Sequence, residues 1–287
     1  MESIDWNGLR GKFLIVCRDA RSLSSNTICA YDQDLSSFQA FLASYNCAAA
    51  AGVDIQKYVQ FLRERGSSAA TVRRRVACLK VFFRWAQIEG LVPRSPFADA
   101  PINIRIPRRL PRSLSRQQVS SIANAVSPMP GAEADGRSVI DPRRTTHLAI
   151  WLMLATGIRV GELTAIRLTE IAMDSGAIRI HGKGSRERTV YITNTNMRDV
   201  VRRYAQAWQR YSFPDDFLLR NVQGRPLTPQ ALRMRLRKLG LALEISQPVT
   251  PHRFRHTAAT TLLEEGVDIR FVRHWSLPPG GAKPRAL

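Results

Sequence analysis

Five prolines interrupt the chain between residues 93 and 111 and limit what it can fold into. Proline lacks a backbone N–H and has a fixed φ, so neither a long helix nor a central strand can run through this stretch. The stretch has few periodic apolar residues and ends in the basic sequence RIPRRLPRSL, which is typical of a stiff linker. Because 287 residues can supply a core on each side of it, we expect two domains.

The residues before the linker carry apolar side chains at helical spacing. These stripes predict helices over residues 25–43 and 55–65, and a third helix that Ser67 or Ser68 would cap and Gly90 would end. One face of the third helix is expected to be buried; it consists of Val72, Val76, Leu79, Phe82 and Phe83.

The remaining surface of this third helix is crowded with cations, namely Arg73, Arg74, Arg75, Lys80 and Arg84. A solvated charged face is the simpler explanation. However, five cations with no acid before Glu89 would repel one another unless a polyanion lay against them. We therefore predict phosphate contact here, and also at Arg108 and Arg109 in the basic linker.

The charge of the whole chain also indicates a polyanionic partner. Its 43 lysines and arginines against 23 acidic residues give a net charge of +20. Codon bias can raise the arginine count, but it does not explain the excess over acids. Because the excess is present on both sides of the linker, both domains are expected to face the same polyanion, and double-stranded DNA is the predicted partner.

The residues after the linker predict a mostly helical domain with one hairpin. Ser115 is a candidate N-cap, and residues 127–145 have the composition of a surface loop. Two segments of period-two alternation flank Gly182–Ser185, which is typical of a β-hairpin. Helical spacing predicts helices over residues 147–157, 160–168, 197–211, 229–239, 251–263 and 268–275. The predicted fold class is therefore mainly α, with a small antiparallel sheet.

Several classes of protein are excluded. Four cysteines without CxxC spacing, five histidines and few acids form no ligand cluster, so we expect free thiols, no metal and no cofactor. No apolar run is long enough to span a bilayer or to form a signal peptide. We expect a soluble cytoplasmic protein, associated with the nucleoid.

Four residues carry the candidate chemistry. Guanidinium groups match the oxygens of a phosphodiester, and Arg159 follows the expected helix end at Gly157. His252 and Arg255 are spaced i, i+3, so a helix would place them on one face. Lys183, at the hairpin tip, is a mobile proton donor. Alone, each has an ordinary surface explanation; their order along the chain, with the local contexts, carries the interpretation.

The ordered set resembles the tyrosine recombinase family, which includes phage integrases and Xer-type enzymes. ATGIRVGELTAIRL and TPHRFRHTAATTLLEEGVDIRFV match its two arginine boxes, and SSAATVRRRVACLKVFFRWA resembles its N-terminal core-binding domain. The resemblance implies a helical core-binding domain over residues 1–106 and a catalytic domain over residues 107–275. It also implies a site-specific recombinase that cuts and rejoins DNA as a homo-oligomer.

Carried over to this chain, the resemblance implies that Arg159 and Arg255 clamp the scissile phosphate. Lys183 becomes the general acid toward the 5′ oxygen, and His252 an acid/base that contacts the phosphate. Glu162 would orient its neighbours, and His256 would pack behind the site. Family enzymes use no metal.

The chain departs from the family pattern after Trp275. Ser276-Leu277-Pro278 stands where Leu-Gly-His is expected, residues 276–287 form a coil outside the pattern, and no tyrosine follows Tyr211. We therefore expect an impaired recombinase with no nucleophile of its own and weakened oligomers. A frameshift would produce such a tail, and an intact recombinase partner could supply the tyrosine.

Two other functions stay open. The chain could be a DNA-binding relic or regulator that occupies recombination sites without cutting. A type IB topoisomerase shares the Arg/Lys/His chemistry but fits the N-terminal half poorly. Substitution of the nucleophile by Tyr191, Tyr204 or Tyr211 is the least favoured alternative.

Overall fold

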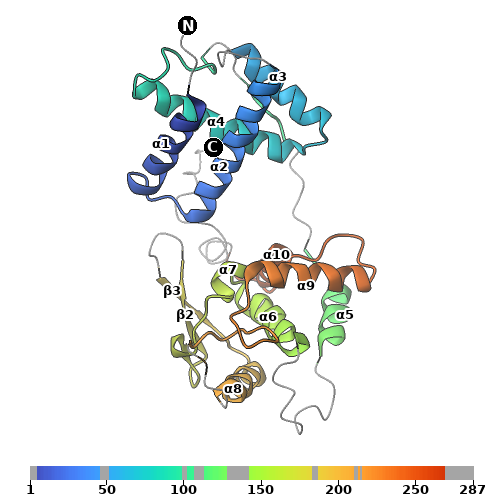
Figure 1. Cartoon of the computed structure of the whole chain (residues 1–287). Helices are drawn as coiled ribbons and strands as arrows, with labels where there is room; N and C mark the ends of the chain where they lie inside the picture. The colour runs from blue at the N-terminus through green and yellow to red at the C-terminus, as the bar shows by residue number, and fades with distance from the viewer. Residues whose placement is uncertain are drawn as a thin grey trace. The chain divides into compact units, whose positions relative to one another are not determined.

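The chain divides into two compact units, Met1–Arg109 and Leu110–Leu287. Both units are mainly helical and the second contains a small antiparallel sheet, which confirms the predicted fold class (Figure 1). None of the described helices is both long and apolar enough to cross a bilayer. The computed structural model describes residues 5–45, 52–98, 102–106, 113–127, 142–182, 187–209, 213 and 215–268.

The described part of the first unit consists of four helices: α1 (Trp6–Asp19), α2 (Ser25–Ser44), α3 (Gly52–Glu64) and α4 (Ala69–Ile88). The helix α1 was not predicted. Ser24 caps α2 and Ser68 caps α4, each by accepting a hydrogen bond from a backbone N–H three residues later. These caps explain why both helices begin where they do.

An aromatic core holds the four helices together. The face of α4 predicted to be buried is at most 4% exposed at each position. Phe82 meets Phe13 from α1 with ring centroids 5.3 Å apart, and Phe38 from α2 meets Tyr58 from α3 at 5.0 Å. Such edge-on and offset pairs add to the free energy of apolar burial. Cys17 and Cys78 are free thiols inside this core.

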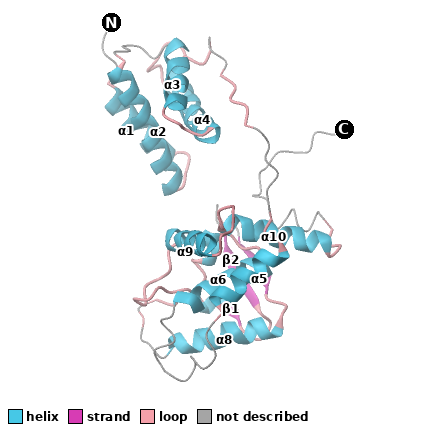
Figure 2. Cartoon of the chain, turned by 90° about the vertical axis from the view of Figure 1, so that its right-hand side faces the viewer, coloured by secondary structure: helices cyan, strands magenta, loops and turns pink. Residues whose placement is uncertain are grey.

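The second unit is built around α6 (Pro142–Thr156). In both views, α6 lies between α8 (Thr195–Gln209) on one side and the pair α9 (Pro229–Ala242) and α10 (Pro251–Glu264) on the other (Figures 1 and 2). The helix α5 (Arg116–Val126) also packs on α6. The predicted cap at Ser115 is confirmed and forms a full capping box with Gln118.

A three-stranded antiparallel sheet completes the second unit, in the order β1 (Ile171–Ala172), β2 (Ala177–His181), β3 (Glu187–Tyr191). The hairpin of β2 and β3 was predicted, whereas β1 was not. In this register Ile178 pairs with Val190 and Ile180 pairs with Arg188, so these residues share one face of the sheet. The three apolar members of that face are at most 3% exposed, which identifies it as the core face.

Two predicted boundaries are wrong for physical reasons. The helix α6 begins at Pro142, inside the predicted surface loop, because proline suits the first helical turn. The helix predicted over residues 160–168 is only the four-residue α7 (Val160–Leu163). There the chain pairs instead with residues 216–218: Leu168 N donates to the Asp216 carbonyl, and Leu218 N donates to the Ile166 carbonyl, both at 2.8 Å.

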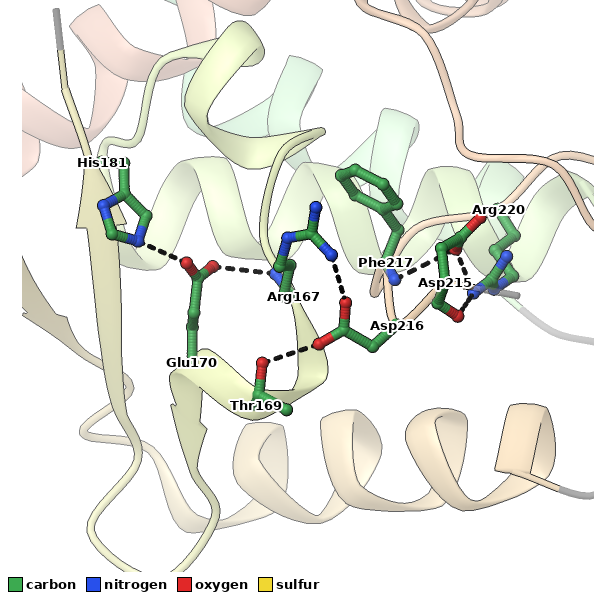
Figure 3. Close-up of polar contacts among 8 residues, drawn as sticks. All are labelled: Arg167, Thr169, Glu170, His181, Asp215, Asp216, Phe217 and Arg220. Atoms are coloured by element: carbon green, nitrogen blue, oxygen red, sulfur yellow. Dashed lines mark hydrogen bonds and ion pairs between the residues drawn. The ribbon is translucent and has the colours of Figure 1, made fainter. Parts of the chain in front are cut away.

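A buried arginine organises the segment between α8 and α9. Arg220 is 2% exposed. Its Nη2 donates to the carbonyl and to Oδ1 of Asp215, both at 2.6 Å (Figure 3). Its Nη1 donates to the Gly224 carbonyl at 2.8 Å. Its guanidinium also stacks 4.1 Å from the centroid of the Phe213 ring. One side chain therefore fixes a stretch that has little regular structure.

We expect Arg220→Met to lower the free energy of unfolding by about 2 kcal/mol, because it strips the Asp215 carboxylate and two carbonyls of their donor. Urea denaturation measures this. Arg225→Met is the matched control, since Arg225 lies in the same segment with an exposed side chain. Equal stabilities of the two variants would show that Arg220 does not organise the segment.

Candidate functional site

Two residues of the RVGEL sequence form the base of the site. Gly157 ends α6 with φ +55°, a left-handed conformation that suits glycine, and Arg159 follows as the N-cap of α7. The backbone N–H of Arg159 donates to Glu162 Oε2 at 2.9 Å, and its Nη1 donates to Oε1 at 2.8 Å. Glu162 therefore fixes both the backbone and the guanidinium of Arg159.

A third residue, Arg188 of β3, joins this pair. Its Nη1 donates to Glu162 Oε1 at 2.9 Å and its Nη2 donates to Oε2 at 2.7 Å. This two-nitrogen contact is the geometry in which guanidinium and carboxylate match best. Arg188 thus connects the hairpin to the turn that carries Arg159.

Arg255 brings the second arginine box to the same place. Thr250 caps α10 and Pro251 occupies its first turn, which places Arg255 on the buried side of the helix at 7% exposure. Its Nη1 donates to the Gly157 carbonyl at the end of α6. Burial, together with the neighbouring charges of Arg159 and Arg188, lowers the pKa of Arg255 to about 10 despite the nearby Glu162. Arg255 is therefore still a cation at neutral pH.

Glu162 is the carboxylate that the guanidinium groups of Arg159 and Arg188 share. Its side chain is 9% exposed. Burial alone would raise its pKa, but hydrogen bonds from Arg188 and Arg159 outweigh burial and lower the pKa to about 2. Two guanidinium groups thus hydrogen-bond one permanent carboxylate, and the charge of Arg255 is close enough to interact with it. The cluster carries two positive charges in excess, which suits it to hold an anion with several oxygens, such as a phosphodiester.

The structure describes only some of the other candidate residues. His252 is exposed on the first turn of α10, one turn before Arg255, and His256 is partly buried one residue after it. Lys183 lies outside the described residues. Of the alternative nucleophiles, Tyr191 is 59% exposed on β3. Tyr204 is buried, with its hydroxyl 2.9 Å from Thr145 Oγ1.

Polar contacts also anchor the β2–β3 ladder at the end that leads to residues 183–186 (Figure 3). The ring of His181, the last residue of β2, lies with Nε2 2.5 Å from Glu170 Oε1 and Nδ1 3.1 Å from Glu187 Oε1. Glu170 in turn accepts a hydrogen bond from the backbone N–H of Arg167, and Arg167 pairs with Asp216 at 2.6 Å. The hairpin is therefore tied to the segment before α9 on one side and to Glu162 on the other.

The cations of the first unit fall into two groups. Arg74 pairs with Asp34, which is 1% exposed, and Arg75 Nε lies 3.7 Å from the other oxygen of that carboxylate. Lys80 donates to the Ile102 carbonyl at 3.1 Å. Arg73 and Arg84 are exposed on α4, and Arg108 and Arg109 lie outside the described residues. The repulsion expected along α4 is thus partly balanced by Asp34 from α2.

Arg188 was not among the residues predicted from the sequence, although a signal for it exists. Alternation in β3 places Arg188 on the same face as Val190, which is buried. A cation on a core face needs a carboxylate partner, and the RVGEL box offers Glu162. Within the part of the chain that the structure describes, no three histidine, cysteine or acidic side chains gather as metal ligands would.

Comparison with known proteins agrees with this geometry. Residues 113–276 match the Phage integrase family, and residues 12–90 match its N-terminal SAM-like domain. The chain is 32% identical over 271 residues to the tyrosine recombinase XerC of a Roseiflexus species, covering 91% of this chain and 82% of that protein. It is 31% identical over 282 residues to XerD of Halalkalibacterium halodurans, covering 95% and 89%.

A solved structure of a lambda integrase dimer bound to a core site has a similar fold, with a TM-score of 0.72 at 15% identity over 98% of both chains. The family match covers more than half of the residues, and it includes all four sequence-predicted catalytic positions and Arg188. This chain belongs to the tyrosine recombinase family.

Proposed function

We propose that the chain is a site-specific DNA recombinase by descent, and that its arginine cluster binds and activates a phosphodiester of duplex DNA. The observation that carries this proposal is that Arg159 and Arg188 both hydrogen-bond the carboxylate of Glu162, while Arg255 is anchored at the Gly157 carbonyl, two residues before Arg159. Such a site holds negative charge that grows on the non-bridging oxygens when phosphorus is attacked. The Xer relatives are named as tyrosine recombinases, which agrees with this chemistry.

In this proposal Arg159 and Arg255 bind the non-bridging oxygens of the scissile phosphate. Lys183 donates a proton to the departing 5′ oxygen, His252 acts as acid/base at the phosphate, and His256 supports the site from behind. Glu162 orients the two clamp arginines. A nucleophile attacks phosphorus and forms a new P–O bond while the bond to the 5′ oxygen breaks.

The two predicted domains have separate roles in the proposal. Residues 1–106 bind DNA through the exposed face of α4. Arg73 and Arg84 are exposed there, and Asp34 is contacted by Arg74 and Arg75 instead. Residues 107–275 carry the phosphate site. The lambda integrase neighbour is described as a dimer bound to DNA, and we infer that this chain also assembles on duplex DNA.

The nucleophile is a separate part of the proposal. The 287 residues contain no tyrosine after Tyr211, and residues 276–287 depart from the family pattern. We infer that a polypeptide of this sequence activates the phosphate without forming a phosphotyrosyl bond by itself. A second recombinase subunit would supply the tyrosine. The alternative function, a regulator that occupies recombination sites, is favoured by the same observation.

One experiment separates phosphate activation from attack. The purified chain is incubated with a nicked duplex selected for binding from a random-sequence library, with and without hydrogen peroxide. Without peroxide we expect binding that weakens steeply with salt, because released counterions drive it, and no covalent adduct. With peroxide, the small hydroperoxide ion can attack phosphorus in place of tyrosine, and we expect strand cleavage that leaves a 5′ hydroxyl.

Each outcome decides between the candidates. Cleavage by peroxide supports an activating site and argues against a purely occupying regulator. Binding without peroxide cleavage favours the regulator. An adduct formed by the chain alone would contradict the missing nucleophile, and binding that is insensitive to salt would contradict the proposal as a whole.

A further inference from the structure

The face of β3 that carries Arg188 is otherwise apolar. Arg188 pairs across the sheet with Ile180 and shares its face with Val190, and both of those residues are at most 3% exposed. A charged residue in such a position costs free energy unless a carboxylate compensates it. Glu162, 26 residues earlier in the chain, provides that carboxylate through two hydrogen bonds. The contact therefore links two segments that carry different parts of the site.

The geometry points to Arg188 as a positioning residue, one that sets the place of Arg159 and of the β2–β3 hairpin together by holding Glu162 from the opposite side. This inference rests on the proposed function, in which Arg159 clamps the phosphate and the hairpin carries Lys183.

The guanidinium of Arg188 is directed at Glu162. Both Nη atoms are engaged by Glu162, and Nε is buried with no hydrogen-bond partner among the described residues. Arg159 differs, because its side chain is 39% exposed and only its Nη1 is engaged by Glu162. Arg188 therefore acts through Glu162, whereas Arg159 can reach a ligand.

The position of Arg188 in the hairpin makes this coupling effective. Glu187, the residue before it, pairs with His181 at the last described rung of the ladder. The ion pair with Glu162 is thus one residue from the point where the strands lead to the Lys183 segment. If the hairpin shifts, Glu162 loses two of its hydrogen bonds, and the guanidinium of Arg159 loses its fixed partner. The position of the last described rung of the hairpin and the position of the Arg159 guanidinium are therefore coupled through Glu162.

The test compares Arg188→Met and Arg188→Lys with Arg179→Met in the full chain. Arg179 is the matched control because it lies on β2 in the same hairpin with an exposed side chain. In Arg188→Met we expect the pKa of Glu162, followed by NMR of carbon-13-labelled glutamate, to rise toward its ordinary value. Amide exchange in β2 and β3 should become faster. For Arg188→Lys we expect a Glu162 pKa and amide exchange rates between those of Arg188→Met and the unmodified chain, since one ammonium group cannot match both carboxylate oxygens.

A reaction readout separates positioning from general destabilisation. In the peroxide assay, Arg188→Met should slow cleavage by about tenfold or more while its Kd for the same duplex changes by less than about twofold. If the unmodified chain does not cleave, the proposed function fails, and the NMR and exchange results still decide the role of Arg188. A Glu162 pKa and hairpin exchange equal to those of Arg179→Met would overturn the inference. Arg188→Lys, which keeps the charge, answers the question if Arg188→Met does not fold.

Discussion

Arg255→Lys is expected to reduce peroxide-driven cleavage of the selected duplex by about 10²–10³-fold, the usual cost of removing one preorganised donor to a developing oxyanion. Lysine keeps the positive charge, so the loss would report the guanidinium geometry rather than charge alone. Arg255 is 7% exposed and anchored at the Gly157 carbonyl, and a single ammonium group cannot hold that carbonyl and two phosphate oxygens together.

The control for this result is Arg233→Lys on α9, where the side chain is exposed. It should cleave at the rate of the unmodified chain. Thermal unfolding of both variants shows whether the fold is kept. A folded Arg255→Lys variant with unchanged cleavage would remove Arg255 from the phosphate site.

Glu162→Gln should have the largest effect on stability. Removing the charge leaves Arg159, Arg188 and Arg255 to repel one another around a neutral amide. The pKa of Glu162 is about 2 in the fold against an ordinary value of 4.5, which corresponds to about 3 kcal/mol of stabilisation by the charged form. We expect urea denaturation at neutral pH to show a loss of about that size.

The same residue gives a dependence on pH with a definite sign. Because the pKa of Glu162 is lowered by folding, its contribution is complete above the ordinary value of 4.5 and disappears as the pH falls toward about 2. The unmodified chain should lose stability over this interval more steeply than Glu162→Gln. Glu187→Gln, whose carboxylate is 55% exposed in the same hairpin, serves as the control. Parallel curves for Glu162→Gln and the unmodified chain would contradict the ion cluster.

Local signals in the sequence predicted the elements that local physics determines. Ser68, Ser115 and Thr250 cap helices because a side-chain oxygen meets a backbone N–H three residues later, and that pattern can be read from neighbouring letters. The hairpin could be predicted because alternation and turn residues adjoin each other. The helix α1 was not predicted because its continuous apolar run, Phe13 to Cys17, is short and does not adjoin its cap, Asp5.

Contacts between distant residues could not be predicted in this way. Arg74 and Asp34 are 40 residues apart, and Arg188 and Glu162 are 26 apart. Spacing rules describe neighbours on one helix or strand, so α4 was expected to repel itself although Asp34 of α2 lies against it. The shortening of α7 has the same origin, since residues 166–168 exchange helical hydrogen bonds for bonds to residues 216–218.

The anchoring of Arg255 at Gly157 also affects the entropic cost of binding a ligand. Immobilising a free arginine side chain costs about 2 kcal/mol in conformational entropy. Arg255 is already held by the Gly157 carbonyl, so this cost falls on folding and not on association. Arg159, with a side chain 39% exposed, keeps more freedom to adjust. A bound phosphate would therefore be held between the fixed side chain of Arg255 and the adjustable side chain of Arg159. Most of the side-chain conformational entropy lost on association should come from Arg159.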